Sequence, residues 1–409
     1  MAITDKEKGV WDLDEVYNKQ NQGGIWSYDG ISQYWQWGGA EYGSFGINES
    51  GTSPSTRKRK SSPTQLPGTT WQTEFYNAPG QAWHSILAKT DGTLWGFGKA
   101  QDWGQLGKNE RIDRSSPVQI GTNNNWKAGG TIREGSFAVK TNGTLYTWGS
   151  NGYGFGGRND RTTRSSPAQV GTDTTWDNVW GGHESLFAIK TDGTLWAWGR
   201  NGSGELGLNQ GPGNEQSSPC QIGTATNWVR CSSSAEYGAN GAINSDGELW
   251  VWGYNQGGEL GQDSVQSPAY RGISAPVQIP GTTWQYFQSC GSSGSVGKKT
   301  DGTLWAWGGQ TMSSGSTGDA TAAGKRSSPC QVGSENNWNR IAGGSGHVVA
   351  TKTDGTLWLW GTNGSGRLGQ NQAPGNLGGV SSPIQVPGTS WVNVNVGGES
   401  QSTIATKIV

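Results

Sequence analysis

The chain has 409 residues, with 30 basic and 31 acidic side chains, so it lacks the charge imbalance that draws proteins to nucleic acid or to an anionic membrane. No apolar stretch approaches the roughly 18 residues of a membrane-spanning helix. Gly accounts for 70 residues and Trp for 24, a composition that argues against disorder and indicates many tight turns. We therefore expect an all-β protein built from short strands.

Residues 1–24 precede the regular part of the sequence and are predicted to form a separate arm. The charged start lacks the apolar core of a secretory signal peptide. Asp12 is a suitable N-cap, and Glu15 follows three positions later as in a capping box. Gly23 can end the short helix that this pattern predicts.

The expected helix carries a possible interaction surface. Trp11 and Val16 are spaced as a hydrophobic staple, and Leu13, Val16 and Tyr17 share one face. These four residues either pack under the main domain or dock on another protein. The stretch GVWDLDEVYNKQNQGG resembles the opening of structural proteins from tailed phages of marine bacteria. That resemblance implies an arm that binds other virion proteins.

Residues 25–409 contain one pattern seven times, at a spacing of about fifty residues. Each copy has an Asp-Gly or Asn-Gly turn, a strand that ends in aromatic-Gly, a segment resembling S-S-P-x-Q, and then a Trp. The aromatic-Gly strands are Tyr34–Gly38, Leu94–Gly98, Leu145–Gly149, Leu195–Gly199, Leu249–Gly253, Leu304–Gly308 and Leu357–Gly361. Turn residues between runs of this length predict sheet rather than helix.

One copy illustrates the four strands expected in every unit. They are Trp176–Gly182, Ser185–Lys190, Thr194–Gly199 and Ser218–Ile222. The Pro of the last strand cannot donate a ladder hydrogen bond, so that strand either begins at the Pro or lies at the edge of the sheet. Four-stranded antiparallel units at this period predict a seven-bladed β-propeller. In such a ring both faces of each blade are covered, so the repeated Trp residues are interpreted as packing between blades rather than as a sugar-binding platform.

The two ends of the chain are predicted to share one blade. The repeats begin with an aromatic-Gly strand at Ile31–Gly38 and stop after Trp391–Lys407, which matches the two strands that normally precede the Asp-Gly turn. Pairing these segments removes two exposed sheet edges.

The repeats resemble those of the regulator-of-chromosome-condensation family. The best copy runs from Gly344 and His347 through Asp354-Gly355 and Trp360-Gly361 to Leu368-Gly369. Propellers of that family act as nucleotide-exchange factors for a small GTPase, as protein-binding modules and, in one bacterial case, as an enzyme inhibitor; they are rarely catalysts. The resemblance makes His84 and His347 structural residues.

Several short motifs are explained by the repeats. The glycines of 202–207 and 364–369 match G-x-G-x-x-G, but they recur in loops between strands and lack the βαβ setting of a dinucleotide site. The three histidines fall in different blades, which does not suit a metal site. The four cysteines are interpreted as small buried apolar residues, with Cys220 and Cys330 in the place of Val118, Ala168 or Ile384. The basic run at residues 57–60 is interpreted as a solvated loop at the blade rim.

We therefore expect a non-enzymatic virion protein of a tailed phage, a rigid propeller displayed on the particle, with no catalytic residues, cofactor or metal. Its expected partners are other virion proteins, bound through the arm, and a host-surface protein or glycan bound through rim loops. The expected location is the virion, assembled in the host cytoplasm. The alternatives are a cellular protein-interaction propeller, either exchange-factor-like or inhibitor-like, and a carbohydrate-binding adhesin.

Overall fold

The structure of the protein is a computed structural model. It describes residues 32–49, 58–73, 83–233, 239–263, 272–290, 294–309, 326–344, 346–372, 379–397 and 402–408. The N-terminal arm lies outside these ranges, so the expected helix and the predicted interaction residues Trp11, Leu13, Val16 and Tyr17 stay predictions.

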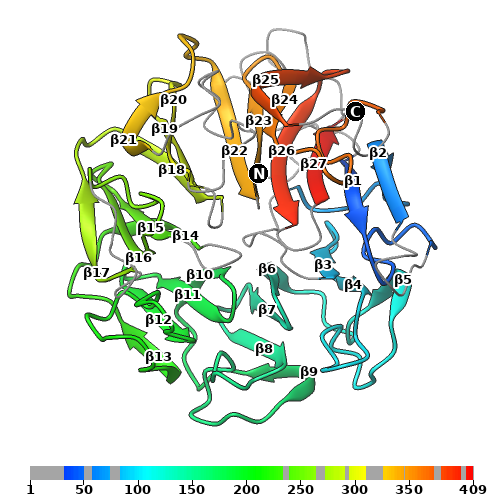
Figure 1. The fold of residues 1–409 in the computed structure, drawn as a ribbon. Helices are drawn as coiled ribbons and strands as arrows, with labels where there is room; N and C mark the ends of the chain where they lie inside the picture. Colours follow the sequence, from blue (N-terminus) through cyan, green and yellow to red (C-terminus); the bar gives the residue numbers. More distant parts are fainter. Residues whose placement is uncertain are drawn as a thin grey trace, which may run out of the picture.

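The described residues form seven antiparallel sheets arranged as blades around a central axis, and they include no helix (Figure 1). Blade 1 contains β26 (Trp391–Gly397), β27 (Ser402–Ile408), β1 (Ser32–Ala40) and β2 (Lys58–Gln65); blade 2 contains β3 (His84–Ala88), β4 (Leu94–Gly98) and β5 (Arg114–Gln119); blade 3 contains β6 (Trp126–Ile132), β7 (Gly135–Lys140), β8 (Leu145–Gly149) and β9 (Arg164–Gln169). Blade 4 contains β10 (Trp176–Gly181), β11 (Ser185–Lys190), β12 (Leu195–Gly199) and β13 (Gln216–Gln221); blade 5 contains β14 (Trp228–Ser232), β15 (Ala239–Asn244), β16 (Leu249–Tyr254) and β17 (Gly272–Ile279). Blade 6 contains β18 (Trp284–Ser289), β19 (Ser295–Lys299), β20 (Leu304–Gly308) and β21 (Arg326–Gln331); blade 7 contains β22 (Trp338–Gly344), β23 (His347–Lys352), β24 (Leu357–Gly361) and β25 (Val380–Val386). In blade 2 the innermost position is marked by an antiparallel bridge between Trp71 and Lys89.

The predicted closure of the ring is confirmed. β1 pairs with β27 in an unbroken antiparallel register from Ser32 opposite Ile408 to Gly38 opposite Ser402. The blue and red ends of the chain therefore lie side by side in one blade (Figure 1). Blade 1 thus has its two inner strands from the C-terminal end and its two outer strands from the N-terminal end.

The outer strand of a blade does not begin at its Pro, which was one of the two positions predicted from the sequence. In blade 4 the expected start was Ser218, but β13 spans Gln216–Gln221 with Pro219 inside it. The other expectation, a place at the sheet edge, is confirmed because β13 pairs only with β12. The register shifts between Ala197 and Gly199 opposite this strand, so the ladder is already interrupted near the Pro.

The second aromatic residue of each aromatic-Gly strand packs between blades. Trp198 is completely buried, as the packing interpretation predicted. Its indole Nε1 donates to the carbonyl of Phe155, which belongs to the β8–β9 loop of the preceding blade, at 2.7 Å. The same bond recurs at other blade boundaries, where Trp37, Trp148, Trp252 and Trp307 donate to carbonyl oxygens of Arg367, Gln105, Glu205 and Glu259. A hydrophobic core thus lies at each boundary. At these five boundaries one directed hydrogen bond also holds the neighbouring loop.

In six blades a half-buried aromatic residue of the same strands takes part in a cation sandwich. In blade 4 the ammonium of Lys190 lies 4.1 Å from the ring centroid of Trp196 and 4.7 Å from that of Trp176. Five further blades repeat this arrangement with Lys89, Lys140, Lys299, Lys352 and Lys407. Because the ammonium interacts with the face of each ring, these lysines join the inner strand to the third strand of their blade.

The cysteine interpretation is correct for Cys231 and Cys290, which are buried, but wrong in part for the other two. Cys220 and Cys330 are half-buried because they lie on outer edge strands. They do occupy the expected repeat position, opposite Ala197 and Ala306. All four are free thiols.

Candidate functional site

The innermost strands of blades 1, 4, 5, 6 and 7 enclose a cavity on the axis of the ring. Each of these strands begins at a Trp that points into a blade boundary, and the register shifts directly after it. The residue two positions after that Trp lines the cavity, namely Asn393, Asn178, Arg230, Tyr286 and Arg340 in blade order. Two positions further along, the lining residues are Asn395, Trp180, Ser232, Gln288 and Ala342. This spacing is the period-two alternation of a strand.

Three cationic side chains surround one aromatic ring in this cavity. The guanidinium carbon of Arg230 lies 4.2 Å from the ring centroid of Tyr286, and that of Arg340 lies 5.2 Å from it. The ammonium of Lys298 lies 5.2 Å from the same centroid and donates to the carbonyl of Asn339 at 2.9 Å. Burial, together with the nearby charge of Arg230, lowers the pKa of Lys298. Because Arg230, Arg340 and Lys298 all lie around Tyr286, this part of the cavity is electropositive.

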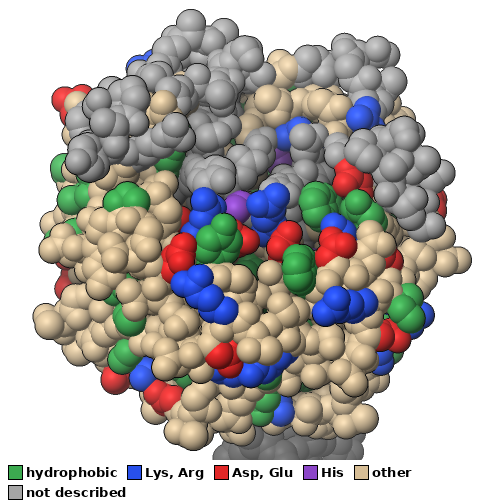
Figure 2. Space-filling view, turned by 60° about the horizontal axis from the view of Figure 1, so that its bottom comes forward, with side chains coloured by type: hydrophobic (Ala, Val, Ile, Leu, Met, Phe, Trp, Pro, Cys, Tyr) green, Lys and Arg blue, Asp and Glu red, His purple; other side chains and the backbone are tan. Residues whose placement is uncertain are grey.

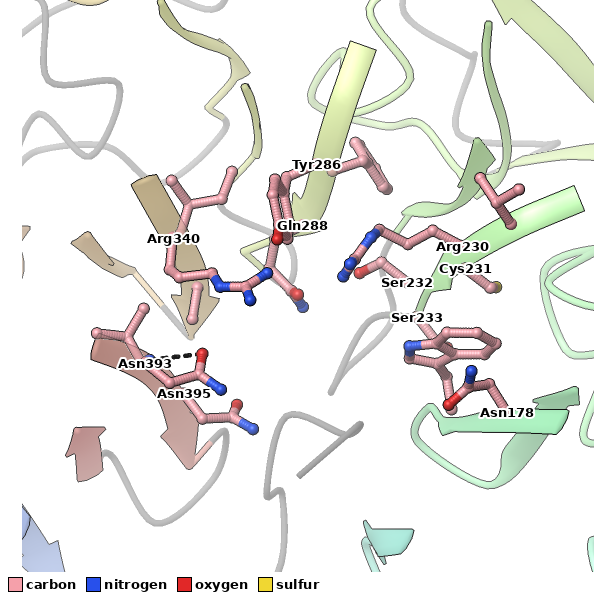
Figure 3. A pocket seen from close by; sticks show the side chains of 16 residues that line it. Asn178, Arg230, Cys231, Ser232, Ser233, Tyr286, Gln288, Arg340, Asn393 and Asn395 are labelled. Carbon is pink, nitrogen blue, oxygen red and sulfur yellow. Dashed lines mark hydrogen bonds between the residues drawn. The ribbon is translucent and has the colours of Figure 1, made fainter. Parts of the chain in front are cut away.

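The cavity has a volume of about 280 Å³, and none of its sixteen described lining residues is Asp or Glu. Figure 3 shows the side chains of Arg230 and Arg340 pointing toward each other, with Gln288 between them. The Oγ of Ser232 and the Nε2 of Gln288 are buried without a hydrogen-bond partner in the structure. Val229, which is 56 % exposed, lies at the edge of the cavity and marks an opening to solvent.

A second polar cluster lies on one face of the ring. We call this the loop face, because it carries the loops that join the first strand of a blade to the second and the third to the fourth. His183 lies between β10 and β11, with Arg133 Nη1 3.4 Å from its Nε2 and Arg200 Nη1 3.1 Å from its Nδ1. The Oε2 of Glu184 lies 3.4 Å from the same Nδ1 and 3.9 Å from Arg200 Nη1. We name these four residues the His183 cluster.

Aromatic side chains occupy the same loop position in three neighbouring blades of the loop face. They are Tyr42, Trp103 and Tyr153, each followed by a Gly with positive φ. Trp103 is 36 % exposed and Tyr153 is 38 % exposed, while the equivalent residue of blade 4 is Ser203. The guanidinium of Arg200 lies 5.4 Å from the ring centroid of Tyr153, which joins this aromatic row to the His183 cluster. Figure 2 shows basic, acidic and histidine side chains gathered around a hollow in the surface.

Other residues noted in the sequence have structural roles. His84 and His347 are buried and contact the neighbouring blade through Ser136 and Thr403, as expected. The G-x-G-x-x-G stretch at 202–207 is a loop in which the Asn201 Oδ1 accepts the N–H of Leu206, without the helix that a dinucleotide site needs. The interpretation of the basic run as a loop is wrong for its last three residues, because Lys58, Arg59 and Lys60 belong to β2 and pair with β1. Lys60 also pairs with Glu49 at 2.9 Å.

The hairpin aspartates are also explained by the fold. In blade 4 the Oδ1 of Asp192 accepts both the N–H and the hydroxyl of Thr194, at 3.0 and 2.7 Å. These bonds lower the pKa of Asp192. Within the described ranges no three His, Cys, Asp or Glu side chains are grouped as a metal site would require. The same ranges include no helix that is long and apolar enough to cross a membrane.

Sequence reasoning missed Arg230, Tyr286 and Arg340. The signal was present, because aligning the repeats on the Trp that opens each unit places these three residues in one column of three successive copies. The other described copies have Thr73, Ala128, Asn178 and Asn393 there.

Comparisons with known proteins agree with the fold. The family model described as the regulator of chromosome condensation (RCC1) repeat matches residues 192–239. The RCC1 domain-containing protein RUG3, mitochondrial, of Arabidopsis thaliana is 30 % identical over 133 residues, which is 32 % of this chain and 30 % of that protein. The chain therefore aligns with less than a third of that relative's length.

Two solved structures match nearly the whole ring. Prp20p of Saccharomyces cerevisiae is 18 % identical with a TM-score of 0.73, covering 93 % of this chain and 92 % of that one. Human WBSCR16 is 20 % identical with a TM-score of 0.72, covering 91 % and 99 %. These similarities correct the expectation of a phage virion protein, because the proteins they identify are cellular RCC1-like proteins. The chain is thus a seven-bladed β-propeller that is similar in architecture to these proteins and contains a match to the RCC1 repeat at residues 192–239.

Proposed function

We propose that this chain is a non-enzymatic protein-interaction module of a cell, and that it binds a partner protein on the loop face. The observation that carries the proposal is the aromatic row beside the His183 cluster. Exposed Trp and Tyr side chains are enriched among the residues that dominate binding energy in protein interfaces. Here Trp103 and Tyr153 are held on rigid loops in adjacent blades, with charged groups of both signs next to them.

Two further points support an interaction role. Loops on a rigid scaffold commonly carry function, and here the loops of Trp103 and Tyr153 are each fixed by an indole hydrogen bond from the next blade. Similar propellers bind proteins: Prp20p has binding properties toward Gsp1p and histones, and yeast RCC1 has been crystallised with Kap60. Those partners belong to the yeast protein, and the proposal for this chain concerns only the class of partner.

The experiment compares two double variants of the full chain as baits in its own cells. In the first, Trp103→Ala and Tyr153→Ala remove the exposed members of the aromatic row. In the matched control, Thr172→Ala and Thr224→Ala change exposed residues on the opposite face, between β9 and β10 and between β13 and β14. We expect the first variant to lose at least about tenfold of a specifically captured protein, the loss of roughly 1.4 kcal/mol of binding energy, while the control retains it. Equal capture by both variants would contradict a loop-face interface.

A further inference from the structure

The central cavity has the chemistry of an anion site, a property separate from protein binding on the loop face. Two guanidinium groups enter it from β14 and β22, the inner strands on either side of β18. Arg230 and Arg340 both contact the face of Tyr286, whose ring attracts cations and keeps two like charges in one small space. Figure 3 shows the two side chains converging on the region beside Gln288.

Neutral donors complete the site. The Ser232 hydroxyl belongs to a side chain that is only 6 % exposed, and its Oγ has no hydrogen-bond partner. The amide Nε2 of Gln288 is likewise without a partner. A buried polar atom left unpaired is destabilising, so an acceptor that reached both groups would be favoured. Asn178, Asn393 and Asn395 add further amides to the wall.

We propose that the central cavity binds a small oxyanion ligand, a molecule whose phosphate or carboxylate group is held between Arg230 and Arg340. Planar guanidinium groups bind both kinds of oxyanion through paired N–H donors, and the charge-assisted bonds are stronger than neutral ones. The volume of about 280 Å³ accommodates a compact anion, and the opening beside Val229 provides an entrance.

The test measures binding of pyrophosphate and of citrate to the purified full chain by isothermal titration calorimetry at low ionic strength. Pyrophosphate reports phosphate recognition and citrate reports carboxylate recognition. We expect saturable binding of at least one probe, which weakens as NaCl is added because salt screens the attraction. Arg230→Gln and Arg340→Gln should each weaken it at least about tenfold, since each removes a charge-assisted pair of hydrogen bonds.

Controls separate loss of the site from loss of the fold. Arg161→Gln removes an arginine that is 57 % exposed at its side chain and pairs with Glu215 on the outer loops, so it should bind the probes like the unaltered chain. Arg340→Lys keeps the charge but not the planar pair of donors, and should bind more weakly than the parent while keeping its melting temperature. Ser232→Ala should reduce affinity without changing net charge.

Three results would overturn the proposal. The first is no binding of either probe at millimolar concentration to the folded chain. The second is equal affinity for the Arg161, Arg230 and Arg340 variants, which would indicate non-specific surface attraction. The third is binding of a poly-glutamate peptide with no binding of pyrophosphate or citrate, which would assign the cavity to an acidic protein segment. None of these results depends on whether the loop-face aromatic row captures a protein.

Discussion

Two buried histidines show how single polar residues connect neighbouring blades. The Nε2 of His84 lies 2.9 Å from the hydroxyl of Ser136, which in turn donates to the carbonyl of Gln105. The Nε2 of His347 lies 3.1 Å from the hydroxyl of Thr403, which donates to the carbonyl of Arg367. Each series of hydrogen bonds runs from the His of one blade to the hydroxyl of the next blade. It then returns to the loop of the first blade whose carbonyl also accepts the indole N–H. The carbonyls of Gln105 and Arg367 are therefore acceptors of two hydrogen bonds each.

The burial of His84 makes the stability of the ring depend on pH. Burial lowers the pKa of His84 from 6.5 to about 3. Between these values the unfolded chain takes up a proton that the folded chain excludes, so the free energy of unfolding falls as the pH decreases below 6.5. One such group contributes a slope of about 1.4 kcal/mol per pH unit in that range, and no slope above it.

The variant His84→Asn tests this slope because Asn cannot take up the proton. Chemical denaturation at several pH values from 7.5 to about 4.5 would give the free energy of unfolding of both proteins, with the parent changing by about 1.4 kcal/mol more per pH unit than the variant once the pH is below 6.5. The variant is expected to be less stable at neutral pH, so the comparison uses the slopes. Parallel pH profiles would show that His84 is protonated in the folded ring or is not responsible for the acid sensitivity.

At the scale of elements, the loop between the third and fourth strands of one blade is positioned by the next blade. In blade 3 this loop presents the carbonyl of Phe155 to Trp198 of blade 4. Gly157 in the same loop has a φ of +69°, and a Cβ there would lie 2.9 Å from the Nε1 of Trp198. The glycine is thus required both by its backbone conformation and by the closeness of the indole.

Trp198→Phe and Trp196→Phe separate this hydrogen bond from the general effect of a smaller ring. Trp198→Phe leaves the Phe155 carbonyl unpaired at a buried boundary, which should cost about 1–3 kcal/mol beyond the loss of packing. Trp196 donates instead to the hydroxyl of Thr194, directly before its own strand, at 2.8 Å and is half-buried, so its replacement should cost less. Denaturation of both variants in urea provides the comparison. A larger loss at Trp196 would contradict the role assigned to the bond between blades.

The sequence predicted the elements well because each has a local cause. Asp192-Gly193 marks a hairpin, and β11 was predicted with its observed bounds, Ser185–Lys190. The early start of β13 was not predicted because the pairing of Gln216 with Gly199 depends on a register shift beyond the Pro. The cavity was not predicted from single residues either, because Arg230 and Arg340 are far apart in sequence and converge only when blades 5, 6 and 7 pack side by side.

For the whole molecule, closure determines whether the axial cavity exists. The inner strand of blade 1, β26, contacts β22 of blade 7, and Asn393 of β26 donates to the carbonyl of Thr73 beside blade 2 at 2.7 Å. The same strand supplies Asn393 and Asn395 to the cavity wall. The C-terminal strands thus join the last blade to the first and complete the lining. Propeller stability and cavity geometry should consequently be lost together when these strands are removed.

Deleting residues 391–409 tests this dependence. The deletion removes β26 and β27, exposes the edge of β1, and takes Trp391 from the core between blades 7 and 1. We expect the cooperative thermal transition in differential scanning calorimetry to be abolished, because the ring then has two open edges.

The matched control is a circular permutant that keeps β26 and β27. It joins Lys407 to Gln33 through the Thr-Asp-Gly turn that connects the corresponding strands of blade 4, so it omits residues 1–32 and 408–409, including only the first residue of β1 and the last residue of β27, and its new termini lie at the exposed Gly223. The permutant should unfold cooperatively, since every blade is then continuous in sequence and β1 still pairs with β27. If the deletion variant melts like the full chain, the pairing of β1 with β27 does not hold the ring closed.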